Sequence, residues 1–222
     1  MLKKFKNLLI NPHYYIWKAV TNINPNIYFE RTSKFAKKFG INDIYLILSF
    51  DCDTQKDIDV LEILNNKLSK IGIKPVYAIP GELILSNINT LKKIKDQGAE
   101  FINHGFKTHT LFIKEKNLNK SIFFYDELNK STIKKDIEKG DFAIKEALKI
   151  DPKGFRTPHF GTFQSKSQRT FLYDILRNLN YEFSTSTSPD KSFFQGPIHI
   201  NSGLYEIPVS GCGYKPFNIL DS

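Results

Sequence analysis

The sequence lacks the features that mark disulfide-bonded, membrane-spanning and fibrous proteins. Its 222 residues include only two cysteines, Cys52 and Cys212, which are too few for a disulfide framework or a zinc ribbon. The longest apolar run, residues 44–50, is far shorter than the ~18 residues that a transmembrane helix needs. No internal repeat and no linker rich in Gly, Pro or Ser divides the chain. With 41% hydrophobic and 25% charged residues, the composition indicates a globular protein, and the length suffices for one large domain or two small ones.

A secretory signal is also lacking. The first ten residues, MLKKFKNLLI, begin with basic residues as a signal peptide does, but their apolar run is short and the polar sequence Asn-Pro-His follows. The low cysteine content is consistent with a reducing compartment. We therefore expect a soluble, cytoplasmic protein.

Positive charge is concentrated at the N-terminus. The net charge is +9, and residues 1–40 carry +7 of it, which leaves +2 for the other 182 residues. This asymmetry predicts weak association of residues 1–40 with an anionic membrane surface, and the alternative is a solvated lysine-rich face. Only four of the 32 basic residues are arginine, the residue most used for specific phosphate and base contacts, so we expect no nucleic-acid partner.

Apolar β-rich runs alternate with segments of helical periodicity. The expected strands are 44–50, 75–79, 100–103, 154–157, 181–187 and 204–209, and the expected helices are 58–71, 82–97, 132–150 and 165–179. Residues 105–130 are predicted to be a long irregular loop. This alternation is typical of a parallel α/β fold. We predict a basic helical extension over residues 1–42 and one α/β domain over residues 43–222.

The first expected strand ends in two carboxylates. In extended chain, Asp51 and Asp53 point to the same side while Cys52 points away. Such a pair can bind a cation or divide the roles of base and metal ligand. The alternative is that Asp53 or Thr54 caps the helix that follows.

Two further strand ends carry polar side chains. His104 and His109 follow the third strand, and a loop helped by Gly105 could bring both imidazoles to one metal; the alternative is two exposed loop histidines. Arg156 follows the fourth strand, where an arginine is normally paired with a carboxylate. The backbone N–H of His159, just after Pro158, could donate to an anionic oxygen, or this segment is only a turn.

Together these residues predict a hydrolytic site, because functional groups in α/β folds collect at the carboxyl ends of strands. One Asp and two His make an open site for a divalent metal, which lowers the pKa of bound water and polarises a carbonyl. A second carboxylate can act as the base, and an N–H can stabilise the oxyanion. That set suits hydrolysis of an amide or an ester.

The order of these motifs resembles the polysaccharide deacetylase family, the NodB-homology domains of carbohydrate esterase family four, over residues 44–210. The matching segments are S-F-D-C-D at 49–53, the two histidines, R-T-P-H at 156–159 and G-L-Y-E-I-P-V at 203–209. The resemblance implies a distorted (β/α) barrel, often of seven strands. It also implies the following roles: Asp51 as catalytic base, Arg156 as the group that orients it, the His159 N–H in the oxyanion hole, and Asp53, His104 and His109 as metal ligands.

The chain departs from the family pattern at three points. The histidines are five residues apart where the family usually has four, and His159 stands where a tyrosine is common. The family's last motif carries a histidine that serves as general acid, and no histidine follows Glu206; His199 precedes that strand. The chain is truncated, or the acid comes from elsewhere, or turnover has been lost.

We therefore expect a metal-dependent hydrolase that removes an acetyl or similar acyl group from an N-acylated sugar of a polysaccharide or glycan precursor. The expected metal is zinc, with cobalt, nickel or iron as alternatives, since an Asp-His-His site accepts all of them. The alternative function is a catalytically silent domain of the same fold that binds a glycan or a partner protein.

Overall fold

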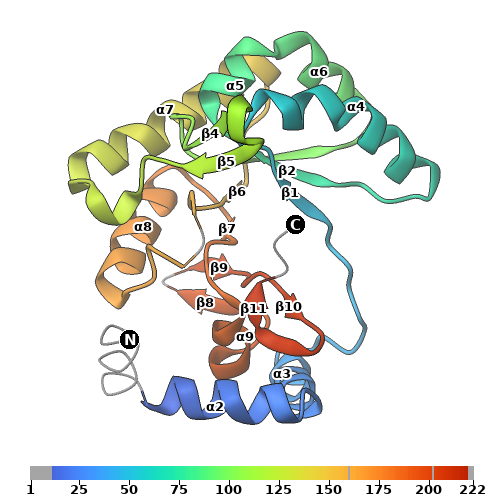
Figure 1. The fold of residues 1–222 in the computed structure, drawn as a ribbon, viewed down its shortest axis with the longest axis vertical. Helices are drawn as coiled ribbons and strands as arrows, with labels where there is room; N and C mark the ends of the chain where they lie inside the picture. Colours follow the sequence, from blue (N-terminus) through green and yellow to red (C-terminus); the bar gives the residue numbers. More distant parts are fainter. Residues whose placement is uncertain (1–11, 160, 202, 220–222) are drawn as a thin grey trace. The chain divides into compact units, whose positions relative to one another are not determined.

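The computed structural model describes residues 12–159, 161–201 and 203–219 (Figure 1). The helices are α2 (Pro12–Ile23), α3 (Asn26–Lys38), α4 (Gln55–Lys70), α5 (Gly81–Ser86), α6 (Ile88–Asp96), α7 (Lys130–Leu148), α8 (Lys166–Asn178) and α9 (Pro189–Gln195). The strands are β1 (Ser49–Asp51), β2 (Val76–Ile79), β3 (Glu100–Asn103), β4 (Thr110–Ile113), β5 (Leu118–Ser121), β6 (Gly154–Phe155), β7 (Phe183–Ser184), β8 (His199–Asn201), β9 (Leu204–Glu206), β10 (Gly211–Cys212) and β11 (Lys215–Ile219). Within these described ranges, no helix has the length and apolar character needed to cross a membrane.

The fold is α/β with a mainly parallel central sheet. Among the described residues this sheet has seven strands in the order β1-β2-β3-β6-β7-β9-β8, as the resemblance implied. The pairs β1–β2, β2–β3, β3–β6 and β6–β7 are all parallel. Their carboxyl ends therefore lie along one edge, and the predicted functional residues follow β1, β3 and β6 at that edge.

The described chain divides into two compact units. The terminal unit contains residues 12–44, 186–201 and 205–219, and the middle unit contains residues 45–185 and 203–204. The predicted helical character of the N-terminal extension is confirmed for α2 and α3. These helices share a unit with C-terminal segments, and the domain boundary between residues 42 and 43 stays a prediction. The lysines of the first ten residues lie outside the described residues.

The core of the middle unit follows from the helical periodicity of its helices. The apolar stripe of α4 is buried at Ile58, Leu61 and Leu68, and it packs with Tyr77 and Ile79 of β2. The predicted helix 132–150 is confirmed as α7, whose apolar positions are buried between the elements around it. Figure 1 shows α4, α5, α6 and α7 gathered around the strands of this unit.

An aromatic cluster forms the core of the terminal unit. Tyr28, Phe193 and Phe217 are buried there. The Tyr28 hydroxyl donates a hydrogen bond to the carbonyl of Pro189 at 3.0 Å, and Arg31 Nε donates to the carbonyl of Phe193 at 2.8 Å. These contacts join α3 to α9, which lies about 160 residues later in the chain.

The prediction of a strand over residues 44–50 covered on both faces is wrong. β1 contains only Ser49–Asp51, and residues 44–47 are 64% to 101% exposed. The reason lies in the neighbouring strand: the Val76 N–H at the start of β2 donates to the carbonyl of Leu48, and no strand pairing of residues 44–47 is found in the described chain. The apolar run therefore extends beyond the last residue that can be paired.

The predicted helix over residues 82–97 is two helices, α5 and α6. Asn87 separates them, because its side-chain Nδ2 donates to the carbonyl of Leu83 at 2.9 Å and its backbone N–H bonds to Ile84 O. Asparagine competes in this way with helical hydrogen bonds. The break turns the chain between the two helices.

Two further expectations need correction. Residues 105–130 are not irregular throughout, because β4 and β5 pair there as an antiparallel hairpin whose turn ends at Asn117 in a left-handed conformation.

The strand expected over 204–209 ends at Glu206, since Pro208 cannot donate to a ladder, and the hairpin β10–β11 follows it.

Candidate metal centre

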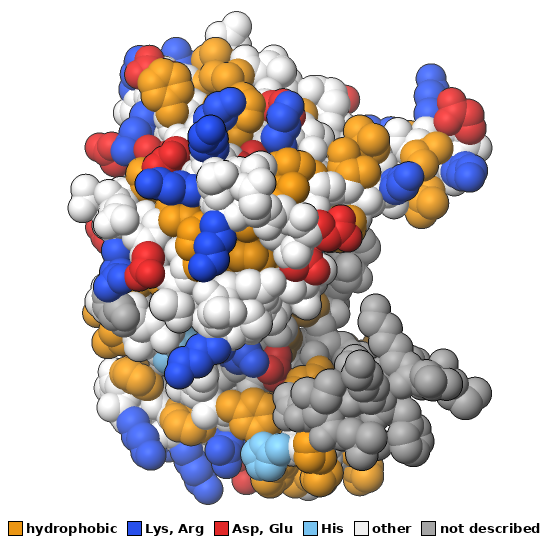
Figure 2. Space-filling view, turned by 90° about the vertical axis from the view of Figure 1, so that its left-hand side faces the viewer, with side chains coloured by type: hydrophobic (Ala, Val, Ile, Leu, Met, Phe, Trp, Pro, Cys, Tyr) orange, Lys and Arg blue, Asp and Glu red, His pale blue; other side chains and the backbone are white. Residues whose placement is uncertain are grey.

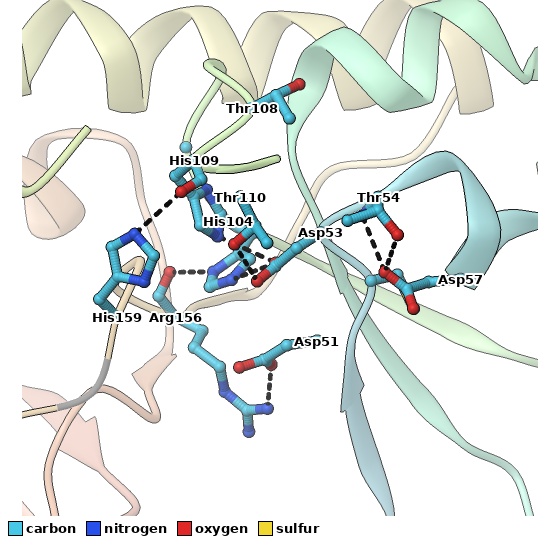
Figure 3. Close-up of polar contacts among 12 residues, drawn as sticks. Asp51, Asp53, Thr54, Asp57, His104, Thr108, His109, Thr110, Arg156 and His159 are labelled. Carbon is cyan, nitrogen blue, oxygen red and sulfur yellow. Dashed lines mark hydrogen bonds and ion pairs between the residues drawn. The ribbon is translucent and has the colours of Figure 1, made fainter. Parts of the chain in front are cut away.

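The three predicted metal ligands lie together at the carboxyl edge of the sheet. Asp53 follows β1, His104 follows β3, and His109 precedes β4 (Figure 3). One ligand atom from each residue lies within 4.8 Å of the others. Both histidines are buried, and the Asp53 side chain is partly exposed. Although the two histidines are five residues apart in sequence, their imidazoles therefore lie close enough to bind one metal ion.

Asp53 is not needed as a helix cap. Thr54 is the N-cap of α4, and both its backbone N–H and its hydroxyl donate to the Asp57 carboxylate at 2.8 Å. The Asp53 carboxylate faces the histidines instead, and the Thr110 hydroxyl donates to its Oδ2 at 3.1 Å. Of the two possible caps considered from the sequence, the structure uses Thr54.

Backbone carbonyls set the orientation of both imidazoles. His104 Nδ1 lies 2.7 Å from the carbonyl oxygen of Arg156, and His109 Nδ1 lies 3.3 Å from that of Lys107. Because a carbonyl oxygen only accepts, each Nδ1 carries the proton in the neutral ring. The two Nε2 lone pairs are then directed at Asp53 Oδ1, at 3.4 Å for His104 and 2.9 Å for His109.

This arrangement fits a divalent metal. Asp53 Oδ1 and His109 Nε2 are buried and have no hydrogen-bond partner among the described residues. Three lone pairs that face one another repel unless a cation lies between them. Two imidazole nitrogens and a carboxylate oxygen are ligands typical of zinc and neighbouring transition metals, and the backbone carbonyls at each Nδ1 orient the rings as in known metal sites.

The pKa shifts favour a neutral imidazole at His109 and a charged carboxylate at Asp53. Burial lowers the pKa of His109. Burial also acts to lower the pKa of His104, but the Asp51 and Asp53 carboxylates more than offset it, so that pKa is raised. Burial acts to raise the pKa of Asp53, yet the two histidines that face its carboxylate hold that pKa well below its ordinary value. The Asp53 side chain is therefore an ionised carboxylate at neutral pH, the form that binds a metal cation.

Asp51 is held by Arg156, as the family resemblance implied. Arg156 Nη1 donates to Asp51 Oδ1 at 2.6 Å, and Nη2 donates to the hydroxyls of Ser49 at 2.7 Å and Thr185 at 3.3 Å. The arginine is buried, whereas the Asp51 side chain is 28% exposed. Because the Arg156 carbonyl also orients His104, this residue links the carboxylate to the metal ligands (Figure 3).

His159 has a structural function that the sequence did not reveal. It adopts a left-handed conformation with φ of 56°, and its Nε2 lies 3.0 Å from the carbonyl of His109 and 2.9 Å from that of Ile122. The ring thus bridges the two chain segments at the open end of the β4–β5 hairpin. The role of its backbone N–H toward an oxyanion stays a prediction.

Sequence reasoning missed three hydroxyl groups. Ser49, the first residue of β1, and Thr185, directly after β7, contact Arg156, and Thr110, the first residue of β4, contacts Asp53. Only Thr185 follows the carboxyl end of a strand in the parallel sheet, and serine and threonine are too common in turns for that position to stand out. Only the folded chain shows which hydroxyls contact the site.

Glu206 and His199 lie in the terminal unit. The buried Glu206 of the E-I-P segment accepts hydrogen bonds from the backbone N–H groups of Ser186 and Thr187, at 2.8 and 3.0 Å, and from the Thr187 hydroxyl. It therefore anchors the chain that follows β7. His199 is buried in β8 of the same unit.

Comparisons with known proteins find similar solved structures and a matching family. A putative polysaccharide deacetylase from Mycobacterium smegmatis is 15% identical, with a TM-score of 0.51 over 74% of this chain and 58% of that one. A family 4 carbohydrate esterase from Streptomyces lividans in complex with acetate is 19% identical, with a TM-score of 0.49 over 64% and 61%. A family 4 pseudoenzyme from Bacillus anthracis is 19% identical, with a TM-score of 0.48 over 66% and 43%. The first of these similarities shows the shared fold.

The chain spans between 43% and 61% of the length of these neighbours. No curated protein matches it. The family model for polysaccharide deacetylase, a metal-dependent family, matches residues 42–183, which include every residue of the candidate centre. On that match, the chain belongs to the polysaccharide deacetylase family.

Proposed function

We propose that the chain is a metal-dependent deacetylase that removes an acetyl or similar acyl group from an N-acylated sugar of a polysaccharide or glycan precursor. The observation that carries this proposal is the Asp51–Arg156 ion pair beside the Asp53, His104 and His109 group. Two carboxylates with different surroundings can divide the work of base and ligand. The family match supports the substrate class.

Asp53, His104 and His109 would hold the metal. A divalent metal there supplies Lewis-acid chemistry, since it polarises the acyl carbonyl and makes water more acidic. Zinc suits the two nitrogens and one oxygen, and cobalt, nickel and iron are the alternatives.

Asp51 is the proposed general base. Arg156 fixes one of its oxygens, and the partial exposure of the side chain leaves it open to a water molecule. The backbone N–H of His159 is proposed to donate to the oxygen of the attacked carbonyl, where negative charge develops. Hydrolysis consumes one water, breaks the acyl carbon–nitrogen bond and leaves acetate and a free amine.

Metal analysis combined with an acetate-release assay tests this proposal. We expect about one divalent metal per chain in the wild type and its loss in Asp53→Ala and His109→Ala. Asp51→Asn is the matched variant: it should keep the metal and lose about 10²- to 10⁴-fold in turnover on an N-acetylated sugar oligomer. A well-folded protein that takes up no zinc or cobalt would contradict the proposed centre.

The second candidate is a silent member of the family that binds a glycan or a partner protein. The observation that favours it is His159, which stands where a tyrosine is common in the family pattern and whose Nε2 lies against the carbonyls of His109 and Ile122. The same experiment separates the two functions. Full metal occupancy without acetate release, together with glycan binding that Asp51→Asn leaves unchanged, would support the silent domain.

We also propose that residues 1–40 associate weakly with anionic membranes while the protein itself stays in the cytoplasm. In the described part of this segment, Ile16 and Ile23 of α2 are exposed, and lysines cluster in the last turn of α3. The alternative of a solvated lysine-rich surface is supported by the wide spread of basic side chains over the face in Figure 2.

Vesicle sedimentation distinguishes these alternatives. Binding to phosphatidylserine vesicles but not to phosphatidylcholine vesicles, lost in the double variant Lys37→Glu/Lys38→Glu and reduced by salt, is the expected result. The control is Lys134→Glu/Lys135→Glu on α7, which makes the same change of net charge elsewhere. Equal loss in both variants would indicate only a general charge effect.

A further inference from the structure

The loop that joins the two histidines, residues 105–108, is held by its surroundings at almost every backbone group. The N–H of Gly105 donates to Asn103 Oδ1 at 2.9 Å. The N–H groups of Phe106 and Lys107 donate to the two oxygens of the Asp136 carboxylate, at 3.1 and 2.9 Å. The N–H of Thr108 donates to Glu82 Oε2 at 2.8 Å.

The carbonyl groups of the loop are also bonded. The carbonyl oxygens of Gly105 and Phe106 accept from the N–H groups of Gly81 and Glu82, at 3.0 and 2.9 Å, at the start of α5. The Lys107 carbonyl accepts from His109 Nδ1. The loop between the candidate ligands is thus fixed from both sides, by α5 and by α7.

Asp136 is built into this arrangement. It is 5% exposed on α7, and the Tyr125 hydroxyl donates to its Oδ2 at 2.7 Å. Gly105 has φ of 75°, and a Cβ there would lie 2.4 Å from Asp136 Oδ2 and 2.7 Å from the Tyr125 hydroxyl. Glycine is therefore required where the loop passes Asp136, since the side chain of any other residue would displace the Asp136 carboxylate.

We infer that Asp136 and Glu82 are positioning residues of the metal centre, which hold loop 105–108 so that His104 and His109 face Asp53 at the separation that a metal needs. The inference rests on the proposed metal site. Neither carboxylate belongs to the Asp-His-His group, and both act through backbone N–H groups within the loop. Metal affinity depends on how well the ligands are held before binding, and loss of a supporting contact typically costs 10- to 100-fold in affinity.

Asp141 offers a matched control. Like Asp136, it lies on α7 and is buried, with 6% of its surface exposed. Its carboxylate accepts a hydrogen bond from the Tyr181 hydroxyl at 3.0 Å and forms an ion pair with Lys145. No hydrogen bond between Asp141 and residues 105–108 is found in the described part of the chain. Asp141→Asn and Asp136→Asn therefore each remove a buried charge from α7, but only the second changes a direct acceptor of the loop's N–H groups.

The test measures the binding of zinc and cobalt to metal-free protein by competition with a chelator. An amide at position 136 has one acceptor oxygen for two N–H donors, so we expect Asp136→Asn to weaken zinc binding about 10- to 100-fold. The visible absorption of the cobalt-loaded protein should change as well, because it reports ligand geometry. Asp141→Asn should keep wild-type affinity and spectrum, even if both variants lose similar thermal stability.

Glu82 gives an independent variant if Asp136→Asn does not fold. Glu82→Ala removes the acceptor for the Thr108 N–H and should weaken zinc binding about tenfold, at the lower end of the range for supporting contacts. Glu82→Gln keeps an acceptor oxygen and should restore most of the affinity. Wild-type affinity and cobalt spectrum in both Asp136→Asn and Glu82→Ala would overturn the inference. No metal binding by the wild type would instead contradict the proposed metal centre.

Discussion

At the scale of single residues, Arg156 has two separate functions. Its guanidinium contacts Asp51, Ser49 and Thr185, and its carbonyl orients His104. The side chain can be changed while the carbonyl stays in place. Substitution at this position therefore separates the positioning of the base from the orientation of a metal ligand.

Arg156→Lys is expected to lower kcat about 10- to 100-fold and to leave the affinity for zinc unchanged. A lysine ammonium lacks the planar fork that holds a carboxylate and two hydroxyls at once, so Asp51 loses its fixed orientation. Acetate release and chelator competition on the same preparation check this result. Loss of zinc in parallel with kcat would show that the side chain also supports the metal ligands.

At the scale of elements, α7 approaches the histidine loop at a glycine. Gly140 lies in the middle of this helix, where glycine costs roughly 1 kcal/mol relative to alanine. A Cβ at this position would lie 2.3 Å from Asn103 Oδ1 and 2.6 Å from the carbonyl oxygen of Gly105. The glycine therefore allows the helix to come close to the loop.

Gly140→Ala is expected to lower the free energy of unfolding by about 1–3 kcal/mol, although alanine favours helix, because overpacking outweighs propensity. Urea denaturation measures the change. Lys135→Ala on the exposed face of α7 is the control and should stay within about 0.5 kcal/mol of the wild type. A more stable Gly140→Ala variant would mean that the close approach does not occur.

The contact between α5 and the loop should depend on pH. Partial burial acts to raise the pKa of Glu82, but the Lys107 ammonium and the Thr108 N–H more than offset it, so its pKa lies below the ordinary value. A carboxylate with a lowered pKa in the folded state stabilises the fold above its unfolded pKa of about 4.3, and this contribution is lost as the pH falls through the folded value.

The stability difference between the wild type and Glu82→Gln should therefore be largest near pH 7 and shrink once the pH falls below about 4.3. Urea denaturation at several pH values between 7 and 3 measures it. Glu115→Gln, at an exposed position, should give a small difference throughout. A difference for Glu82→Gln that grows toward low pH would have the wrong sign for this ion pair.

At the scale of the whole molecule, the terminal unit joins the two ends of the described chain around one aromatic core. The Phe193 ring contacts Trp17, Tyr28 and Phe217 at centroid distances of 5.2, 5.9 and 5.3 Å. Arg31 lies over the same ring, 4.9 Å from its centroid. The N-terminal helices and the C-terminal hairpin therefore share one stabilising cluster.

Phe193→Ala is expected to cost about 3–5 kcal/mol, the usual range for removing a buried aromatic ring. Because the cluster is shared, hydrogen exchange should become faster in residues 12–38 and 215–219 together, although these segments are far apart in sequence. Phe142→Ala, at a position that is 64% exposed, is the control and should change little. Faster exchange in only one of the two segments would contradict a shared core.

Local patterns predicted the parts of the fold that local forces decide. The periodicity of Ile58, Leu61 and Leu68 predicted α4, and the buried stripe confirmed it. The wrong predictions concern segments whose state depends on a partner. Residues 44–47 have high strand propensity, but β2 begins at Val76 and leaves them without a paired strand in the described chain. Asn87 breaks a periodic helix through its own side chain.

The sequence by itself determined which chemical groups reach the carboxyl edge of the sheet, because strand alternation and motif order are local properties. It could not decide whether Asp53 capped a helix or faced the histidines, or what held the loop between them. The tertiary structure decided both: Thr54 caps α4, and Asp136, nearly thirty residues beyond the loop, accepts its N–H groups. Such contacts depend on the packing of elements that are distant in sequence, and no local pattern contains that information.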